Sequence, residues 1–87
     1  MPHFLSTHRD PSVSKDRLEA KWTNLAQERG AIWVKTWYNL PSGRRYCWWD
    51  APDLEILEQI FARHGVSWEE IIQVELTTPS EWRWRED

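Results

Sequence analysis

The side chains best suited to bind a metal ion in this chain are its three histidines, His3, His8 and His64. Imidazole nitrogen is a ligand for nickel, copper and zinc. Because side chains alternate along a strand, His3 and His8 would face opposite ways and could not share an ion without a bend or a second subunit. No His-x-x-x-His or Cys-x-x-Cys spacing occurs. The spacing alone defines no metal site, and ordinary structural roles are the alternative for all three.

The single cysteine, Cys47, stands between Tyr46 and Trp48, so the chain cannot form an internal disulfide. A catalytic thiolate requires a basic, partly exposed setting. The aromatic neighbours instead favour a small buried side chain. The acidic residues and glycines indicate neither a glycosidase pair nor a phosphate-binding loop. These features favour a binding protein over an enzyme.

Tryptophan supplies eight of the 87 residues. A packed indole buries roughly 150–250 Å², and a domain of this size has little interior in which to hide eight. Four of them, Trp33, Trp37, Trp48 and Trp49, lie on two runs that are typical of the arms of a β-hairpin. With Tyr46 they are the candidate lining of a ligand pocket or an interface. The sequence predicts an aromatic sheet face that a second subunit, a ligand or both must cover.

Apolar periodicity and turn residues predict six elements that would position these side chains. Strands are expected over residues 3–8, 31–39, 44–49 and 72–77, and helices over 15–29 and 54–64. The order β-α-β-β-α-β predicts an α+β, ferredoxin-like fold, in which two helices cover one face of a four-stranded antiparallel sheet. One domain would span residues 1–79. Residues 80–87 would form a tail of tryptophan and arginine, residue types common at interface hot spots.

Side-chain alternation then assigns residues to the two faces of this sheet. Leu5 and Val34 are expected beneath the helices, which places Trp33, Lys35 and Trp37 on the open face. An open face with two tryptophans is a larger apolar patch than most soluble monomers tolerate. Face-to-face pairing of two sheets would cover it, so we predict a two-fold homodimer.

Charge and hydropathy narrow the class of partner. The net charge of −3 and pI of about 5.6 lack the basic footprint of a nucleic-acid binder. The aromatic run 44–49 is compatible with RNA stacking, but the glycine and phenylalanine spacing typical of RNA-recognition modules is missing. No apolar run approaches the ~18 residues of a membrane span. No signal peptide is visible, and a cytoplasmic location is expected.

Several short stretches occur together along the chain: Trp33-Val34-Lys35-Thr36-Trp37-Tyr38, Tyr46-Cys47, Ala51-Pro52-Asp53, and Gly65-Val66 followed by Ile71 and Val74. In these stretches the chain resembles a family of short bacterial proteins. The family was formerly a domain of unknown function and is now often labelled nickel-binding protein. The resemblance spans the first strand to about Thr77, and Tyr-Cys followed by Ala-Pro-Asp is its most specific element. It implies a ferredoxin-like subunit, homodimerisation, and surface binding of nickel for sequestration rather than catalysis.

The sequence departs from the family pattern in two ways. Members commonly carry a histidine in the second helix where this chain has Ile60, which removes one plausible nickel ligand. Trp48 and Trp49 replace smaller or aliphatic residues. The second departure suggests an interface or pocket rebuilt around aromatic rings.

The alternative function is that of a dimeric α+β barrel, an enzyme or carrier, that binds a small apolar or aromatic ligand. The hairpin aromatics would form the walls of its pocket, and His8 would supply a polar handle. Fold alone does not establish such a function. An enclosed pocket with convergent polar groups would favour it, whereas a filled core would count against it.

Overall fold

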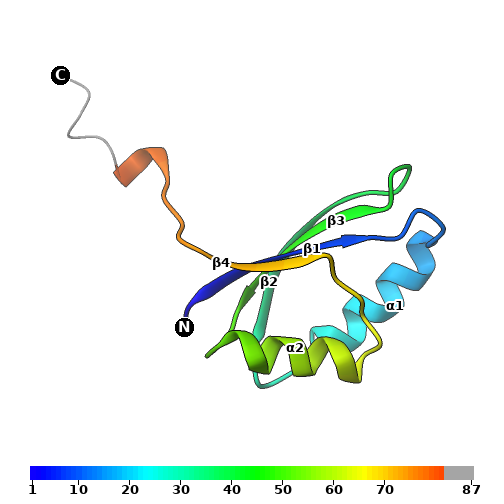
Figure 1. Ribbon diagram of the computed structural model, residues 1–87. Helices are drawn as coiled ribbons and strands as arrows, with labels where there is room; N and C mark the ends of the chain where they lie inside the picture. Colours follow the sequence, from blue (N-terminus) through cyan, green and yellow to red (C-terminus); the bar gives the residue numbers. More distant parts are fainter. Residues whose placement is uncertain (82–87) are drawn as a thin grey trace.

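The computed structural model describes residues 1–81 and contains one antiparallel sheet with two helices against one of its faces (Figure 1). The elements are β1 (His3–Arg9), α1 (Lys15–Leu25), β2 (Ile32–Asn39), β3 (Arg44–Asp50), α2 (Leu54–Arg63) and β4 (Glu70–Val74). The strand order is β2-β3-β1-β4, with antiparallel pairing throughout. The predicted ferredoxin-like α+β fold is confirmed. The predicted tail falls largely on residues 82–87, outside the described part.

Both helices begin at a side-chain cap. The Ser14 hydroxyl accepts a hydrogen bond from the Arg17 backbone N–H at 3.2 Å, and the Asp53 carboxylate accepts one from Ile56 at 2.9 Å. These bonds satisfy N–H groups that have no partner within the helix. α1 ends at Leu25, earlier than predicted, because the next residues tighten into short i→i+3 bonds. α2 is followed by Gly65, whose φ of +65° reverses the chain.

The hydrophobic core lies between the sheet and the two helices. Trp49 occupies its middle with 1% of its surface exposed, and its ring meets the edge of Phe61 at a centroid distance of 5.7 Å. Such edge-to-face pairs add to the energy of burial. The buried apolar residues around them include Phe4, Leu18, Leu25, Ala31, Cys47, Ala51, Leu57, Ile60 and Val66.

One irregularity in β2 overturns part of the predicted assignment of faces. Trp33 pairs with Trp49, but two residues later Lys35 already pairs with the adjacent Trp48, so the register shifts between them. Trp33 therefore packs against the core on the helix side, its ring 6.1 Å from that of Trp22. The prediction that Trp33 lies on the open face is wrong, because one extra residue in a strand reverses the side-chain alternation.

The predicted orientation of the central strand is also wrong. Phe4 begins the buried series of β1, so Leu5 lies on the open face, opposite Ile72 of β4. In β4 the residue that packs against the core is Ile71. Val34 lies at the register shift and is 36% exposed rather than covered. Phe4 and Ile71 sit beside other apolar residues, and a continuous apolar run does not reveal which member points inward.

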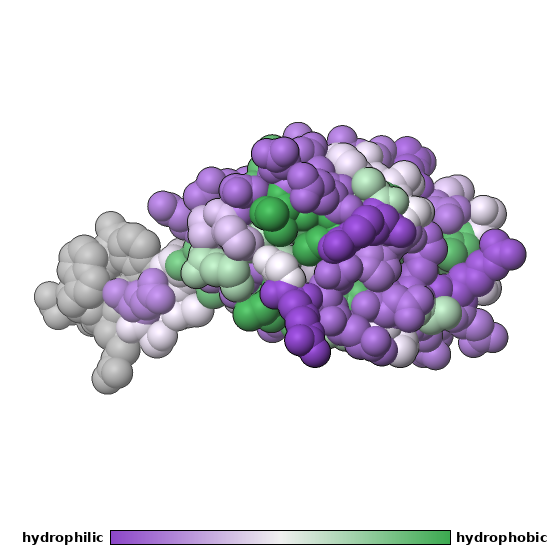
Figure 2. Space-filling model, turned by 90° about the horizontal axis from the view of Figure 1, so that it is seen from below, coloured by the Kyte–Doolittle hydropathy of each residue, from purple (hydrophilic) through white to green (hydrophobic). Residues whose placement is uncertain are grey.

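The outer surface of the two helices differs in polarity from the uncovered face of the sheet. Seen from below in Figure 2, it is mostly hydrophilic, with a small apolar area near its middle. No helix in residues 1–81 has the length and apolar character needed to cross a lipid bilayer. Large exposed apolar side chains instead lie on the opposite side, where the sheet is uncovered: Trp37, Tyr46 and Ile72.

Candidate functional site

His8 lies beneath the helices, and both of its ring nitrogens form hydrogen bonds. Its Nε2 is 2.8 Å from the Ser6 hydroxyl, and its Nδ1 is 2.7 Å from the Ser67 carbonyl oxygen. A carbonyl oxygen only accepts, so Nδ1 donates and Nε2 accepts from the serine. Burial lowers the pKa of His8, opposed by the bond to Ser67 and reinforced by the Arg45 charge. His8 is therefore a neutral core residue with neither nitrogen free for a metal.

His3 lies on the open face of the sheet, at the start of β1. Its Nδ1 contacts Oδ1 of Asp50, the residue opposite it in the register with β3. The same oxygen accepts a hydrogen bond from Trp48 Nε1 at 3.1 Å, and the Trp48 ring meets the His3 ring edge-on. Within residues 1–81, no hydrogen bond involves Nε2 of His3. A carboxylate that fixes one nitrogen of an imidazole is the usual arrangement behind a metal-binding histidine.

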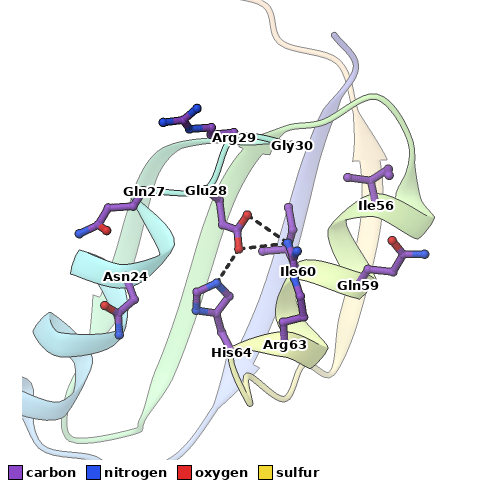
Figure 3. Close-up of a pocket in the computed structure, with 10 residues that line it drawn as sticks. All are labelled: Asn24, Gln27, Glu28, Arg29, Gly30, Ile56, Gln59, Ile60, Arg63 and His64. Atoms are coloured by element: carbon purple, nitrogen blue, oxygen red, sulfur yellow. Dashed lines mark hydrogen bonds and ion pairs between the residues drawn. The ribbon is translucent and has the colours of Figure 1, made fainter.

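His64 lies at the end of α2, beside a groove of about 680 Å³ between α2 and the segment that follows α1 (Figure 3). Its Nε2 is 2.7 Å from Glu28 Oε1, and Arg63 Nη2 donates to both oxygens of the same carboxylate at 3.0 and 3.1 Å. Figure 3 shows Glu28 pointing between these two side chains. The His64 hydrogen bond and the Arg63 charge lower the pKa of Glu28. This carboxylate is thus already paired with a cation.

The three histidines occupy three separate places: the open face, the core and the helix groove. In the part of the chain that the structure describes, no group of three or more metal-ligand side chains exists. His3 and His64 each have one carboxylate partner, Asp50 and Glu28, neither of which the sequence singled out. The Asp50 partnership follows from β1–β3 register, and the Glu28 partnership from the packing of two distant segments. Only the first could have been read from the strand order.

The five aromatic residues predicted to line a pocket or an interface divide between the faces. Trp37 and Tyr46 are 52% and 39% exposed on the open face, next to the half-buried Trp48. The Lys35 ammonium lies 5.9 Å from the Trp37 ring and 5.7 Å from the Trp48 ring, within range of cation–π attraction. The other two, Trp33 and Trp49, belong to the covered side. We call the exposed group, with its neighbours Leu5 and Ile72, the open aromatic face.

A cavity lies between α1 and the sheet, where the alternative function requires a ligand pocket. Its volume is about 20 Å³, and its lining includes His8, Trp33 and Trp49. Pockets for small organic ligands usually measure roughly 300–1,000 Å³. A cavity of this size has room for about one water-sized group. The covered side is therefore close to the filled core that counts against an apolar-ligand carrier.

Comparison with known proteins gives two findings. A family model described as "Nickel responsive protein SCO4226-like" matches residues 4–74. The crystal structure of SCO4226 from Streptomyces coelicolor A3(2) matches with a TM-score of 0.76 and 24% sequence identity, over 87% of this chain and 99% of that chain. At that identity the structural likeness shows the fold alone. No curated protein matches the chain.

Proposed function

Since the chain belongs to the SCO4226-like family of nickel-responsive proteins, we propose that it is a non-enzymatic homodimer that binds nickel and sequesters it. The observation that carries this proposal is the His3–Asp50 pair, which lies on the uncovered face of the sheet. A second subunit placed there would bring its own pair. The metal site and the dimer interface would then occupy the same surface.

The geometry favours Nε2 of His3 as the nickel-binding atom. Asp50 holds Nδ1 of this ring and so fixes its tautomer and orientation. Imidazole nitrogen is a good ligand for Ni²⁺. One subunit supplies no cluster of three donors among residues 1–81. A two-fold interface would double the available donors, and water molecules would complete the coordination.

The helix groove supports nickel binding less well. A cation at Glu28 and His64 would replace the proton between them and lie beside the Arg63 guanidinium, which already neutralises Glu28. Like charges at that separation repel. His64 therefore serves as the matched control for His3: it is another histidine paired with a carboxylate, but on the opposite side of the molecule.

The open aromatic face supports the dimer. Trp37, Tyr46 and Ile72 are all more than a third exposed. Trp37 and Tyr46 face each other on β2 and β3, and Ile72 lies on β4 at the other edge of the same sheet face, beyond β1. Apolar patches on a sheet are energetically costly in water and are commonly buried by a partner. A second copy offers the same flat, aromatic surface, which a two-fold axis would make self-complementary.

Calorimetric titration with Ni²⁺, combined with sedimentation with and without the metal, tests this proposal. The full-length protein should bind nickel with saturable heat, and His3→Ala should abolish that heat. Asp50→Asn should weaken binding about 10- to 100-fold, as loss of an orienting carboxylate does at other metal sites. His64→Ala should leave the affinity unchanged.

Heat no greater than the dilution blank would overturn the nickel proposal. Equal loss in His3→Ala and His64→Ala would overturn the location of the site. A single 10.6 kDa species at micromolar concentration, with and without nickel, would overturn the dimer.

A further inference from the structure

Arg45 lies on the covered side of the sheet, where its side chain is partly exposed. Arg45 carries a buried nitrogen, Nη1, that has no hydrogen-bond partner in residues 1–81. None of the ion pairs found in those residues involves Arg45. A buried charged donor without a partner costs several kcal/mol in general, and buried polar groups in proteins are almost always satisfied. The place beside Nη1 is therefore suited to a group that accepts a hydrogen bond and carries negative charge.

Arg45 borders the cavity between α1 and the sheet. In the register it stands between His8 of β1 and Tyr38 of β2, on the helix-covered face. The cavity measures about 20 Å³, and a second cationic side chain, that of Lys21 on α1, also lines it. The Lys21 ammonium donates to the Gly65 carbonyl in an exposed hydrogen bond of 3.1 Å, so Arg45 Nη1 is the donor beside this cavity that residues 1–81 leave without a partner. The cavity has room for about one small group.

Among residues 1–81, no carboxylate lines this cavity. Its other polar side chains are already committed: Thr36 Oγ1 accepts from Trp33 Nε1 at 2.8 Å and donates to the Cys47 sulfur at 3.2 Å. Burial raises the pKa of the Cys47 thiol, and burial with the Arg45 and Lys21 charges lowers the pKa of His8. Both groups are therefore neutral near pH 7 and bring no negative charge to the cavity, whereas the Glu69 carboxylate lies outside the lining and acts on His8 from there.

The rest of the wall is apolar, with three aliphatic side chains, Leu18, Leu25 and Val66, beside four aromatic ones. Trp22, Trp33, Trp49 and Phe61 contribute to it. Aromatic rings carry partial positive charge at their edges, so ring edges tolerate an anion where ring faces do not. A bound water would satisfy the hydrogen bond of Nη1 without the additional charge attraction that an anion would gain from the guanidinium.

We propose that the cavity beside Arg45 binds one small monovalent anion of halide size through Arg45 Nη1. The site lies on the opposite side of the sheet from the His3–Asp50 pair, so it is independent of nickel binding. An anion there would fix Arg45 against α1 and stabilise the packing of that helix on the sheet. Larger oxyanions such as sulfate exceed the available space.

Thermal unfolding at constant ionic strength tests this site. Sodium chloride or bromide is exchanged for sodium gluconate, whose anion is too large to enter. The wild-type protein should show a saturable rise in Tm with the halide, because a ligand that binds only the folded state stabilises it. Arg45→Gln should lose this rise. Arg44→Gln should keep it, because Arg44 is exposed on the other face and its replacement removes the same charge.

Equal Tm values in halide and gluconate for the wild type, or the same halide response in Arg45→Gln, would overturn the proposal. If Arg45→Gln does not fold, the wild type alone decides. Crystals grown in sodium bromide and measured at the bromine absorption edge should show an anomalous peak beside Arg45 Nη1. The absence of such a peak at saturating bromide would contradict the site.

Discussion

On the covered face of the sheet, Trp49 is 1% exposed and His8 uses both ring nitrogens in hydrogen bonds. On the open face, Trp37 is 52% exposed and His3 has only its Nδ1 engaged among the described residues. Two residues of the same type thus differ in exposure and hydrogen bonding in each case: the two histidines lie on β1, and the two tryptophans lie on the paired strands β2 and β3. The difference arises from which side of the sheet the helices cover.

Side chains on the two faces of the sheet therefore have different physical roles. Side chains beneath the helices have close-packed rings and, among the described residues, hydrogen-bonded polar groups apart from Arg45 Nη1; this packing stabilises a small domain. Side chains on the open aromatic face retain apolar area and donor atoms that have not been committed. We therefore expect changes beneath the helices to alter the free energy of unfolding, and changes on the open face to alter association and metal binding.

Trp49→Ala should give the largest loss of stability. The substitution leaves a large cavity against Phe61 and removes an almost fully buried indole, which costs about 3–5 kcal/mol in comparable cores. Urea unfolding followed by circular dichroism measures it. The matched control is Trp37→Ala, measured at the same low protein concentration, where the loss should be less than about 1 kcal/mol. Equal losses would contradict the separation between the two faces.

Trp37→Asp should have the largest effect on self-association. A carboxylate at the middle of an apolar interface must lose its hydration without gaining a partner. We expect the dimer dissociation constant to rise about 100-fold, which corresponds to roughly 2.7 kcal/mol, while the circular dichroism spectrum is retained. Sedimentation equilibrium measures this. Gln59→Glu, which adds the same charge on the helix layer, should leave association unchanged, and unaltered association in Trp37→Asp would place the interface elsewhere.

The element order, both helix caps and the glycine after α2 could be predicted because each has a local cause: apolar period, a capping side chain or a positive φ. The face of the sheet on which Trp33 lies could not be predicted from the sequence. It depends on a register shift against β3, and the energy that selects such a shift comes from tertiary packing, here between Trp33 and Trp22 of α1.

The candidate site likewise has features that the sequence predicts and features that depend on tertiary structure. The histidines were visible as residue types, but their distinct roles depend on partners 36 to 59 residues away: Glu28 for His64, Asp50 for His3 and Ser67 for His8. Only the register of β1 with β3 links one of these pairs to a regular feature of the fold. Arg45 gave no signal in the sequence, because an unpaired charge is recognisable only when its surroundings are known.

The protonation of His8 offers the smallest and most specific test of the covered face. Burial, Arg45 and Lys21 lower the pKa of His8 in the folded state, although the Ser67 hydrogen bond and Glu69 oppose them. In the unfolded chain this histidine takes up a proton below about pH 6.5. The folded state resists the same proton, so stability is lost as the pH falls through that value.

Between pH 7 and pH 5.5 we therefore expect this residue to contribute a loss of stability that grows as the pH falls. His8→Asn removes the titrating group, so its unfolding free energy should depend less steeply on pH in this window, whatever its stability at pH 7. Urea unfolding at several pH values measures both slopes. Glu28 does not interfere, because its lowered pKa confines its contribution to more acidic solutions. Identical slopes would mean that His8 is protonated in the folded state as readily as in the unfolded chain. The covered face would then admit water next to His8, where the structure shows this residue buried.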